Sequence, residues 1–224
     1  MQAIVPIRDA NRNDRTSAGS LLVEATLDWA ERLLVLGLYG WLVYRLLASA
    51  WAGGSKLDLL LLPSEGLVVV FMLLRRRASV LSRNWGDWLL AIVVTCAPMG
   101  VRPAPAVLPL YLQFAAATVL MMGTLIQLHA KFTLGRSIGC VPAHRGLRMA
   151  GPYQFVRHPM YAGYLLSHLA FLALNPTLWN LAVYAVASAL QIPRLLAEER
   201  LLCNDPLYSA YQSRVRYRLV PGLF

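Results

Sequence analysis

The amino-acid sequence predicts an all-α, polytopic membrane protein with about five to six transmembrane helices, the last two forming a helical hairpin. Of the 224 residues, 58% are hydrophobic and 14% are charged, and the mean hydropathy is +0.52. Soluble domains carry more charge and fewer apolar residues. In addition, apolar stretches recur along the chain, and the basic residues gather between alternate stretches. These observations together predict a membrane protein.

The chain opens with a polar segment, residues 1–20, in which Arg8, Arg12 and Arg15 stand among Asn, Asp, Thr and Ser. It has neither an apolar core nor a small-residue cleavage site, so we interpret it as a cytoplasmic tail and not as a signal peptide. We expect N-terminal transmembrane helices in residues 21–130 and a functional half in residues 131–224.

Several apolar runs approach the length that a transmembrane helix needs. Those in the first part of the chain are 33–51, 58–74, 88–100 and 107–128. Two shorter runs, 161–174 and 177–192, are joined by the turn dipeptide Asn175-Pro176, which predicts the tight hairpin. Arg45 and Glu65 each lie within a span, and we expect them to pair because charges inside membranes usually pair.

The distribution of positive charge predicts the orientation. Eighteen of the 21 Lys and Arg residues fall in the segments 1–32, 75–83, 131–157 and 194–218, all on one side of the predicted membrane. The positive-inside rule places this side, with both termini, in the cytoplasm. The net charge of +10 therefore reflects topology and contact with anionic lipid in the bilayer, and we predict no nucleic-acid partner. We interpret residues 75–77, three consecutive arginines, as a lipid-contact run.

Neither cysteine nor histidine spacing indicates a metal site. The three cysteines are far apart and form no CxxC pair, which also argues against a disulfide framework. The four histidines are separated by 15, 14 and 10 residues, a spacing that fits no ligand set on one helix face. We expect His168, within an apolar run, to make an interhelical hydrogen bond.

The segment 131–159 is the longest non-hydrophobic stretch, and loops of this kind often carry function. At its end, Arg157 and His158 precede Pro159, which suits the first turn of a helix. Backbone N–H groups and the positive end of the helix dipole favour an anionic ligand there. The alternative is a basic loop that contacts lipid head groups, with His158 capping the helix.

Arg194 and Glu198 are four residues apart, so they share one face of the second hairpin helix. An ordinary salt bridge is one interpretation, although Arg before Glu is the less favourable order. Ionisable groups at a membrane boundary are functional candidates. Because both ends of a hairpin lie on one side, we expect this face and the His158 loop to form one cytoplasmic pocket.

Three motifs together resemble the isoprenylcysteine carboxyl methyltransferase family and its relatives, which include phospholipid N-methyltransferases and membrane thiol methyltransferases. They are GPYQFVRHPMYAGY at 151–164, RLLAEERLL at 194–202 and DPLYSAYQSRVRYRLVPG at 205–222. The resemblance covers roughly residues 131–222. It implies an all-helical membrane enzyme that takes a methyl group from S-adenosylmethionine and releases S-adenosylhomocysteine. No GxGxxG motif of the soluble dinucleotide-binding type is present.

The resemblance also implies roles for individual residues. Arg194 matches the arginine at the substrate, and Arg194 and Glu198 are the expected catalytic residues. The expected cofactor-binding residues are Leu147, Arg148, Tyr153, His158, Pro159, Met160, Tyr161 and Glu198. The segment Ala143-His144-Arg145 departs from the family's more polar sequence before this loop.

Physical chemistry agrees with these roles. Glu198 suits the ammonium group of S-adenosylmethionine, and Arg157, His158 and the helix-entry N–H groups suit its carboxylate. Tyr153 and Tyr161 suit the sulfonium through cation–π contact. A membrane lipid or isoprenoid-like acceptor would enter from the bilayer, with Arg194 aligning its polar head.

Arg194 favours an acceptor with a carboxylate, such as an isoprenylcysteine. A phospholipid amine, a small thiol and another isoprenoid remain open, because a fold does not select an acceptor. Two other classes are also open: a transporter or channel with Arg45 and Glu65 on its pathway, and a non-catalytic scaffold that has kept the fold.

Overall fold

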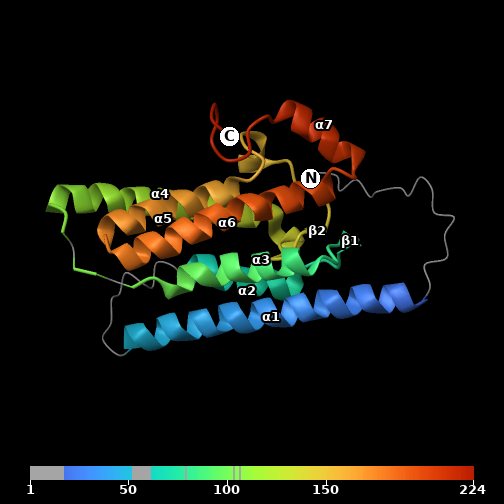
Figure 1. Cartoon of the computed structure of the whole chain (residues 1–224), viewed down its shortest axis with the longest axis horizontal. Coiled ribbons are helices and arrows are strands. Elements are labelled where there is room, and N and C mark those ends of the chain that lie inside the picture. The colour runs from blue at the N-terminus through green and yellow to red at the C-terminus, as the bar shows by residue number, and fades with distance from the viewer. Residues whose placement is uncertain (1–17, 52–61, 79, 103, 106) are drawn as a thin grey trace.

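The computed structural model describes residues 18–224 apart from 52–61, 79, 103 and 106. Most of this part is helical, and the long helices run side by side along the long axis of the molecule (Figure 1). Their bounds are α1 (Ala18–Trp51), α2 (Leu62–Leu74), α3 (Trp85–Cys96), α4 (Leu110–Leu134), α5 (Pro159–Leu174) and α6 (Leu178–Leu202). The short helix α7 (Pro206–Arg214) lies across the outside of the bundle near the C terminus (Figure 1).

Short elements complete the described part. The 3-10 turns are η2 (Ala97–Gly100), η3 (Gly135–Ser137) and η4 (Gly151–Gln154). β1 (Val80–Leu81) pairs antiparallel with β2 (Ala143–His144), with Val80 opposite His144. This small ladder is the departure from the predicted all-α architecture, and it ties the α2–α3 connection to the loop that follows α4.

Two helical segments of the described chain are long and apolar enough to cross a membrane, namely Leu110–Ser137 and Leu178–Leu202. Trp85–Gly100 and Pro159–Leu174 are shorter apolar helices. The expected hairpin is formed by α5 and α6, and the side chain of Thr177 caps α6 by accepting from Asn180 N–H. The total of five to six spans stays a prediction.

Helix α1 begins 15 residues before the predicted span 33–51, at Ala18. Two of the residues before Leu33, Asp28 and Glu31, are buried although both are acidic. Their carboxylates pair with Arg75, which is also buried. The interpretation of Arg75 as a lipid-contact residue is therefore wrong, because its guanidinium faces inward to these two carboxylates.

The α4–α5 contact is close because glycine faces glycine. A Cβ on Gly163 would lie 2.8 Å from the carbonyl oxygen of Gly123 and 2.7 Å from Cγ of Gln127. Gln127 donates to Oγ of Ser167 at 2.8 Å across the same contact. Small residues with one interhelical hydrogen bond are a typical way for membrane helices to pack.

The end of the bundle away from β1 and β2 is held by two asparagines. The side chain of Asn180, fully buried at 0% exposure, accepts from Arg102 N–H at 2.9 Å and donates to the Arg102 carbonyl at 2.8 Å. Asn175 accepts from Ala104 N–H. Arg45 in α1 donates to the carbonyl of Met99, while the side chain of Glu65, its predicted partner, lies outside the described residues.

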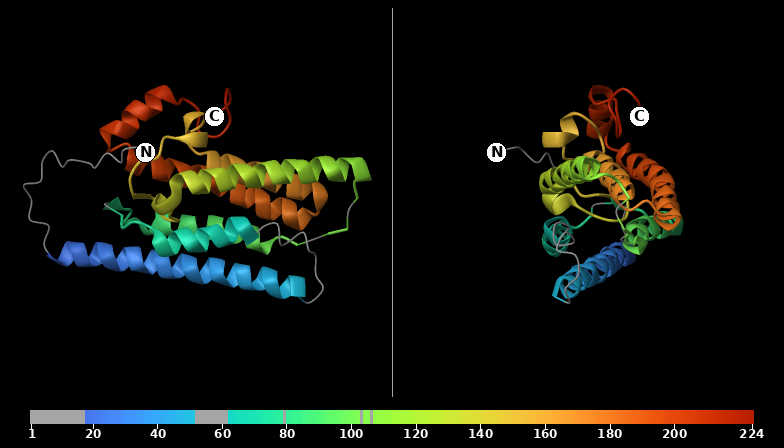
Figure 2. Two further views of the ribbon diagram at one scale, coloured as in Figure 1. Left: turned by 180° about the vertical axis from the view of Figure 1, so that it is seen from behind. Right: turned by 90° about the vertical axis from the view of Figure 1, so that its left-hand side faces the viewer.

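The connections that carry the predicted basic segments gather at the other end. In Figure 1 the start of α1, the α2–α3 connection, the α4–α5 connection and the end of α6 all lie at the end of β1 and β2. The end-on view in Figure 2 shows α1 at one edge of the bundle and the α4–α5–α6 group on the opposite side. The candidate site forms between that group and the loops above it.

Candidate functional site

A cavity of about 80 Å³ lies where the α4–α5 connection meets α6 and α7. We call it the loop pocket. Its walls include Leu147, Arg148, Tyr153, His158, Met160, Tyr161 and Glu198 from the predicted cofactor set, together with Arg145, Arg157, Tyr208 and Tyr211. Pro159 is the one predicted cofactor residue that does not line it; it is buried at the first turn of α5. The structure thus gathers seven of the eight predicted cofactor residues around one cavity, whereas Arg194, which we expected in the same pocket, lines a different cavity.

Glu198 and Tyr161 form the inner wall of the loop pocket. The hydroxyl of Tyr161 donates to Oε2 of Glu198 at 2.8 Å. The imidazole of His158 stacks on the Tyr161 ring with centroids 5.6 Å apart and an interplanar angle of 8°. Glu198 is the carboxylate that faces the cavity, and its partner there is a neutral hydroxyl.

The neighbouring carboxylate, Glu199, is buried and surrounded by donors, a role that sequence reasoning missed. Arg157 Nε lies 2.8 Å from Oε1, and His158 Nε2 lies 3.2 Å from the same oxygen. Arg218 Nε lies 2.9 Å from Oε2, and the hydroxyl of Tyr208 donates to Oε1 at 3.4 Å. Glu199 therefore joins the start of α5, α7 and the C-terminal tail.

The entrance of α5 is bonded to that tail. Arg157 N–H donates to the carbonyl of Tyr217 at 2.9 Å, and His158 N–H donates to the carbonyl of Arg218 at 2.8 Å. These are two of the groups that the sequence suggested for an anionic ligand, and protein atoms occupy them. Arg148 differs, because it lines the pocket without a hydrogen bond or ion pair to any residue in the described ranges.

Three buried tyrosines form the outer wall. The hydroxyl of Tyr211 donates to the carbonyl of Tyr153 at 2.6 Å and so links α7 to η4. Burial raises the pKa of Tyr153 well above its ordinary value, and it raises the pKa of Tyr211 to about 12. Burial likewise raises the pKa of Tyr208. All three are therefore neutral hydrogen-bond donors near neutral pH.

A second, larger cavity of about 220 Å³ lies among the long helices. We call it the helix cavity. Its lining is mostly apolar and comes from six helices, with Val35, Tyr39 and Leu42 of α1, Val68 and Met72 of α2, Val94 and Thr95 of α3, Leu120 of α4, Phe171 of α5 and Ala187 of α6 among them. His168 also lines it, and its ring stacks on Tyr184 of α6 with centroids 4.3 Å apart. His168 makes no hydrogen bond within the described residues, so the expected interhelical bond is replaced by stacking.

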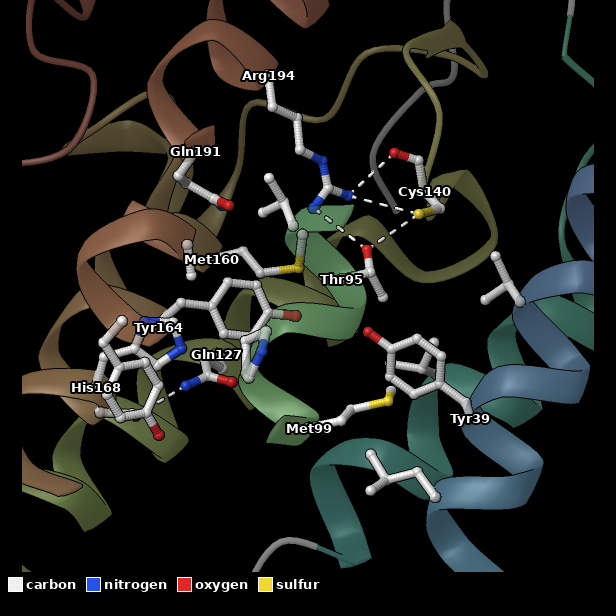
Figure 3. A pocket seen from close by; sticks show the side chains of 18 of the residues that line it. Tyr39, Thr95, Met99, Gln127, Cys140, Met160, Tyr164, His168, Gln191 and Arg194 are labelled. Carbon is white, nitrogen blue, oxygen red and sulfur yellow. Dashed lines mark hydrogen bonds between the residues drawn. The ribbon is translucent and has the colours of Figure 1, made fainter. Parts of the chain in front are cut away.

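Arg194 occupies the end of the helix cavity nearest the loops (Figure 3). Its Nη2 donates to the carbonyl of Cys140 at 3.0 Å, and its Nη1 lies 3.5 Å from Oγ1 of Thr95. The guanidinium carbon lies 5.5 Å from the ring centroid of Tyr161. A buried charge needs such partners, and here they come from a loop, from α3 and from an aromatic face.

The two cavities meet at Met160, which lines both. Tyr161 stands beside it, with Arg194 over its ring and Glu198 at its hydroxyl. The two residues of the predicted Arg194–Glu198 face therefore line different cavities. Arg194 lines the helix cavity, Glu198 lines the loop pocket, and both contact Tyr161.

Comparison with known proteins agrees with this geometry. Residues 108–204 match the isoprenylcysteine carboxyl methyltransferase (ICMT) family. This stretch is less than half of the 224-residue chain, and it is similar to a family of membrane methyltransferases. A search of curated proteins gives no match. The family match includes α4, α5 and α6, and thus most of the loop pocket, but it leaves out the first three helices.

Proposed function

We propose that this protein is a methyltransferase that uses S-adenosylmethionine and acts on a lipophilic acceptor, by carboxyl O-methylation of an isoprenylcysteine-like molecule. The observation that supports it most is the meeting of two unlike cavities at Met160. One lies among the loops and is lined by several charged and tyrosine side chains, while the other lies among the helices and is mostly apolar. A polar methyl donor and a lipid acceptor need this combination.

The residues of the loop pocket fit the chemistry of S-adenosylmethionine, which supplies an activated methyl group when bound. Glu198 offers a carboxylate to its ammonium, and Arg148 offers a guanidinium to its carboxylate. Tyr153 and Tyr161 offer neutral aromatic surfaces to its sulfonium. Arg157 and His158 also line the pocket, but both are bonded to Glu199, so we propose that they shape the site.

For the acceptor, Arg194 provides a buried guanidinium at the mouth of an apolar cavity. It would hold a carboxylate against the Tyr161 side of the site. A carboxylate is ionised near neutral pH, so the reaction needs no general base. Rate enhancement would come from alignment and from exclusion of water by the surrounding helices.

We further propose a multi-pass protein whose N terminus, loop pocket and C terminus face the cytoplasm. In support, the loops that carry most of its positive charge gather at the end of the bundle where the loop pocket lies. Water-soluble cofactor would then reach the pocket directly, while the acceptor would arrive through the bilayer.

The test is calorimetric titration of the detergent-purified full chain with S-adenosylmethionine and S-adenosylhomocysteine. We expect micromolar binding that Glu198→Ala removes and that Glu24→Ala retains, because Glu24 pairs at the surface with Arg83. Methyl transfer from labelled cofactor to farnesylcysteine, a phospholipid amine and a small thiol then identifies the acceptor. Well-folded protein that binds neither cofactor form would overturn the proposal in favour of a transporter or a scaffold.

A further inference from the structure

Glu31 of α1 lies far in sequence from the site, yet its carboxylate is bonded to a loop that reaches it. The residue is fully buried, with 0% of its surface exposed. Its Oε1 accepts from Cys140 N–H at 2.7 Å and from Val141 N–H at 3.0 Å. Its Oε2 pairs with Arg75 and Arg145. Both oxygens are thus engaged, one by the backbone and the other by guanidinium groups.

The peptide between Cys140 and Val141 carries this contact to the site. Its N–H donates to Glu31, and its carbonyl, that of Cys140, accepts from Arg194 at 3.0 Å. A peptide group is planar, so an N–H held at one side fixes the direction of the C=O at the other. A carboxylate on the N–H also polarises the amide and strengthens the hydrogen bond that its carbonyl accepts.

We infer that Glu31 is a positioning residue for Arg194, acting through the Cys140–Val141 peptide. The inference rests on the proposed function. It gives the first helix, which lies outside the family match at residues 108–204, a part in catalysis as well as in packing. Loss of the carboxylate at this point lets the carbonyl of Cys140 turn, and Arg194 then no longer holds the acceptor in line.

Asp28 supplies a matched comparison, one helical turn before Glu31. It is also buried, and it pairs with Arg75 at 2.8 Å, as Glu31 does. Within the described residues, its carboxylate contacts arginines and makes no hydrogen bond with the backbone of residues 138–142. A change at Asp28 therefore perturbs the buried ion pairs while it leaves the bonds to the Cys140–Val141 peptide in place.

The experiment compares Glu31→Asp, Glu31→Gln and Asp28→Asn in the full chain, in detergent or in lipid vesicles. Glu31→Asp keeps the charge for Arg75 and Arg145, but it is one methylene shorter and withdraws from the peptide N–H groups. We expect kcat with the acceptor to fall about tenfold or more, the usual effect of losing one charge-assisted hydrogen bond. Affinity for S-adenosylhomocysteine should match that of Asp28→Asn, and the midpoint of thermal unfolding should fall no further than it does in Asp28→Asn, which removes a buried charge.

Two results would overturn the inference. One is an equal loss of turnover in Glu31→Asp and Asp28→Asn. The other is a loss of turnover in both Glu31 variants that is proportional to their loss of folded protein. Either result would make Glu31 a structural residue. Failure of the proposed function looks different, because wild-type protein would then bind no S-adenosylhomocysteine and transfer no methyl group. Glu31→Gln supplies a second folded variant, whose amide oxygen can still accept from the peptide, so its turnover should exceed that of Glu31→Asp.

Discussion

Glu198 and Glu199 are adjacent in α6, yet the structure predicts opposite outcomes when each is changed to glutamine. Glu198 faces the loop pocket and accepts from the hydroxyl of Tyr161. Glu199 is buried against Arg157, His158 and Arg218. The first change removes a charge from the surface that we propose binds the cofactor, whereas the second removes the counter-charge of buried arginines.

The magnitudes follow from these surroundings. A charge-assisted hydrogen bond contributes about 1.5–3 kcal/mol, so Glu198→Gln should weaken cofactor binding by about 10- to 150-fold. Its effect on stability should be small, because the glutamine oxygen can still accept from Tyr161. Removal of one partner from a buried ion pair costs about 3–5 kcal/mol. Since glutamine keeps a hydrogen-bond acceptor, the loss of stability in Glu199→Gln should be at or below the lower end of this range. The loss in Glu199→Ala should lie within the range.

The assay pairs calorimetric titration of S-adenosylhomocysteine with thermal unfolding, on the same detergent preparations. We expect Glu198→Gln to lose affinity at an unchanged unfolding midpoint, and Glu199→Gln to lower the midpoint. The reasoning fails if Glu199→Gln matches wild-type stability, or if Glu198→Gln binds the cofactor product as well as the wild type does.

Three further predictions concern other parts of the site and the bundle. Arg194→Lys keeps the buried charge but loses the fork that reaches Cys140, so kcat should fall on the order of a hundredfold while affinity for S-adenosylhomocysteine stays at the wild-type level. Tyr211→Phe removes the hydrogen bond to Tyr153 and should cost about 1 kcal/mol. Burial raises the pKa of Tyr211 to about 12, so the stabilisation that the protonated hydroxyl contributes is fully present below pH 10 and is lost as the pH rises toward 12. Across this pH window, the unfolding midpoint should therefore fall less steeply in Tyr211→Phe than in the wild type. Gly163→Ala inserts a Cβ into the α4–α5 contact and should destabilise the protein by about 1–3 kcal/mol. In Gly40→Ala no atom lies within 4 Å of the new Cβ, so the unfolding midpoint should stay unchanged or rise. Differential scanning fluorimetry distinguishes these results.

The sequence predicted the parts of the fold that local pattern governs. The hairpin at Asn175-Pro176 is present, and so is the helix that begins at Pro159. Most residues assigned to the cofactor line one pocket, because they come from a continuous loop and from one helix face. Short-range spacing is sufficient for predictions of this kind.

Contacts between distant segments were not predictable in the same way. Glu31 and Arg145 are 114 residues apart, and no spacing rule connects them. Asp28 and Glu31 lie before the predicted span 33–51, and the buried Arg75 that pairs with both of them is far away in the sequence. Similarly, the sequence motifs gave Glu199 no role, and only the return of the tail to α5 shows that it contacts His158 and Arg218.

The residues that line the two cavities come from different parts of the sequence. Every residue around the loop pocket falls between Leu134 and Tyr211, whereas ten of the residues around the helix cavity come from Val35 to Val101. Substitutions in the first three helices can therefore reshape the cavity that we propose for the acceptor without changing the walls of the pocket that we propose for the methyl donor. Within such an architecture, related proteins can diverge in the lipid they modify while they keep one common donor.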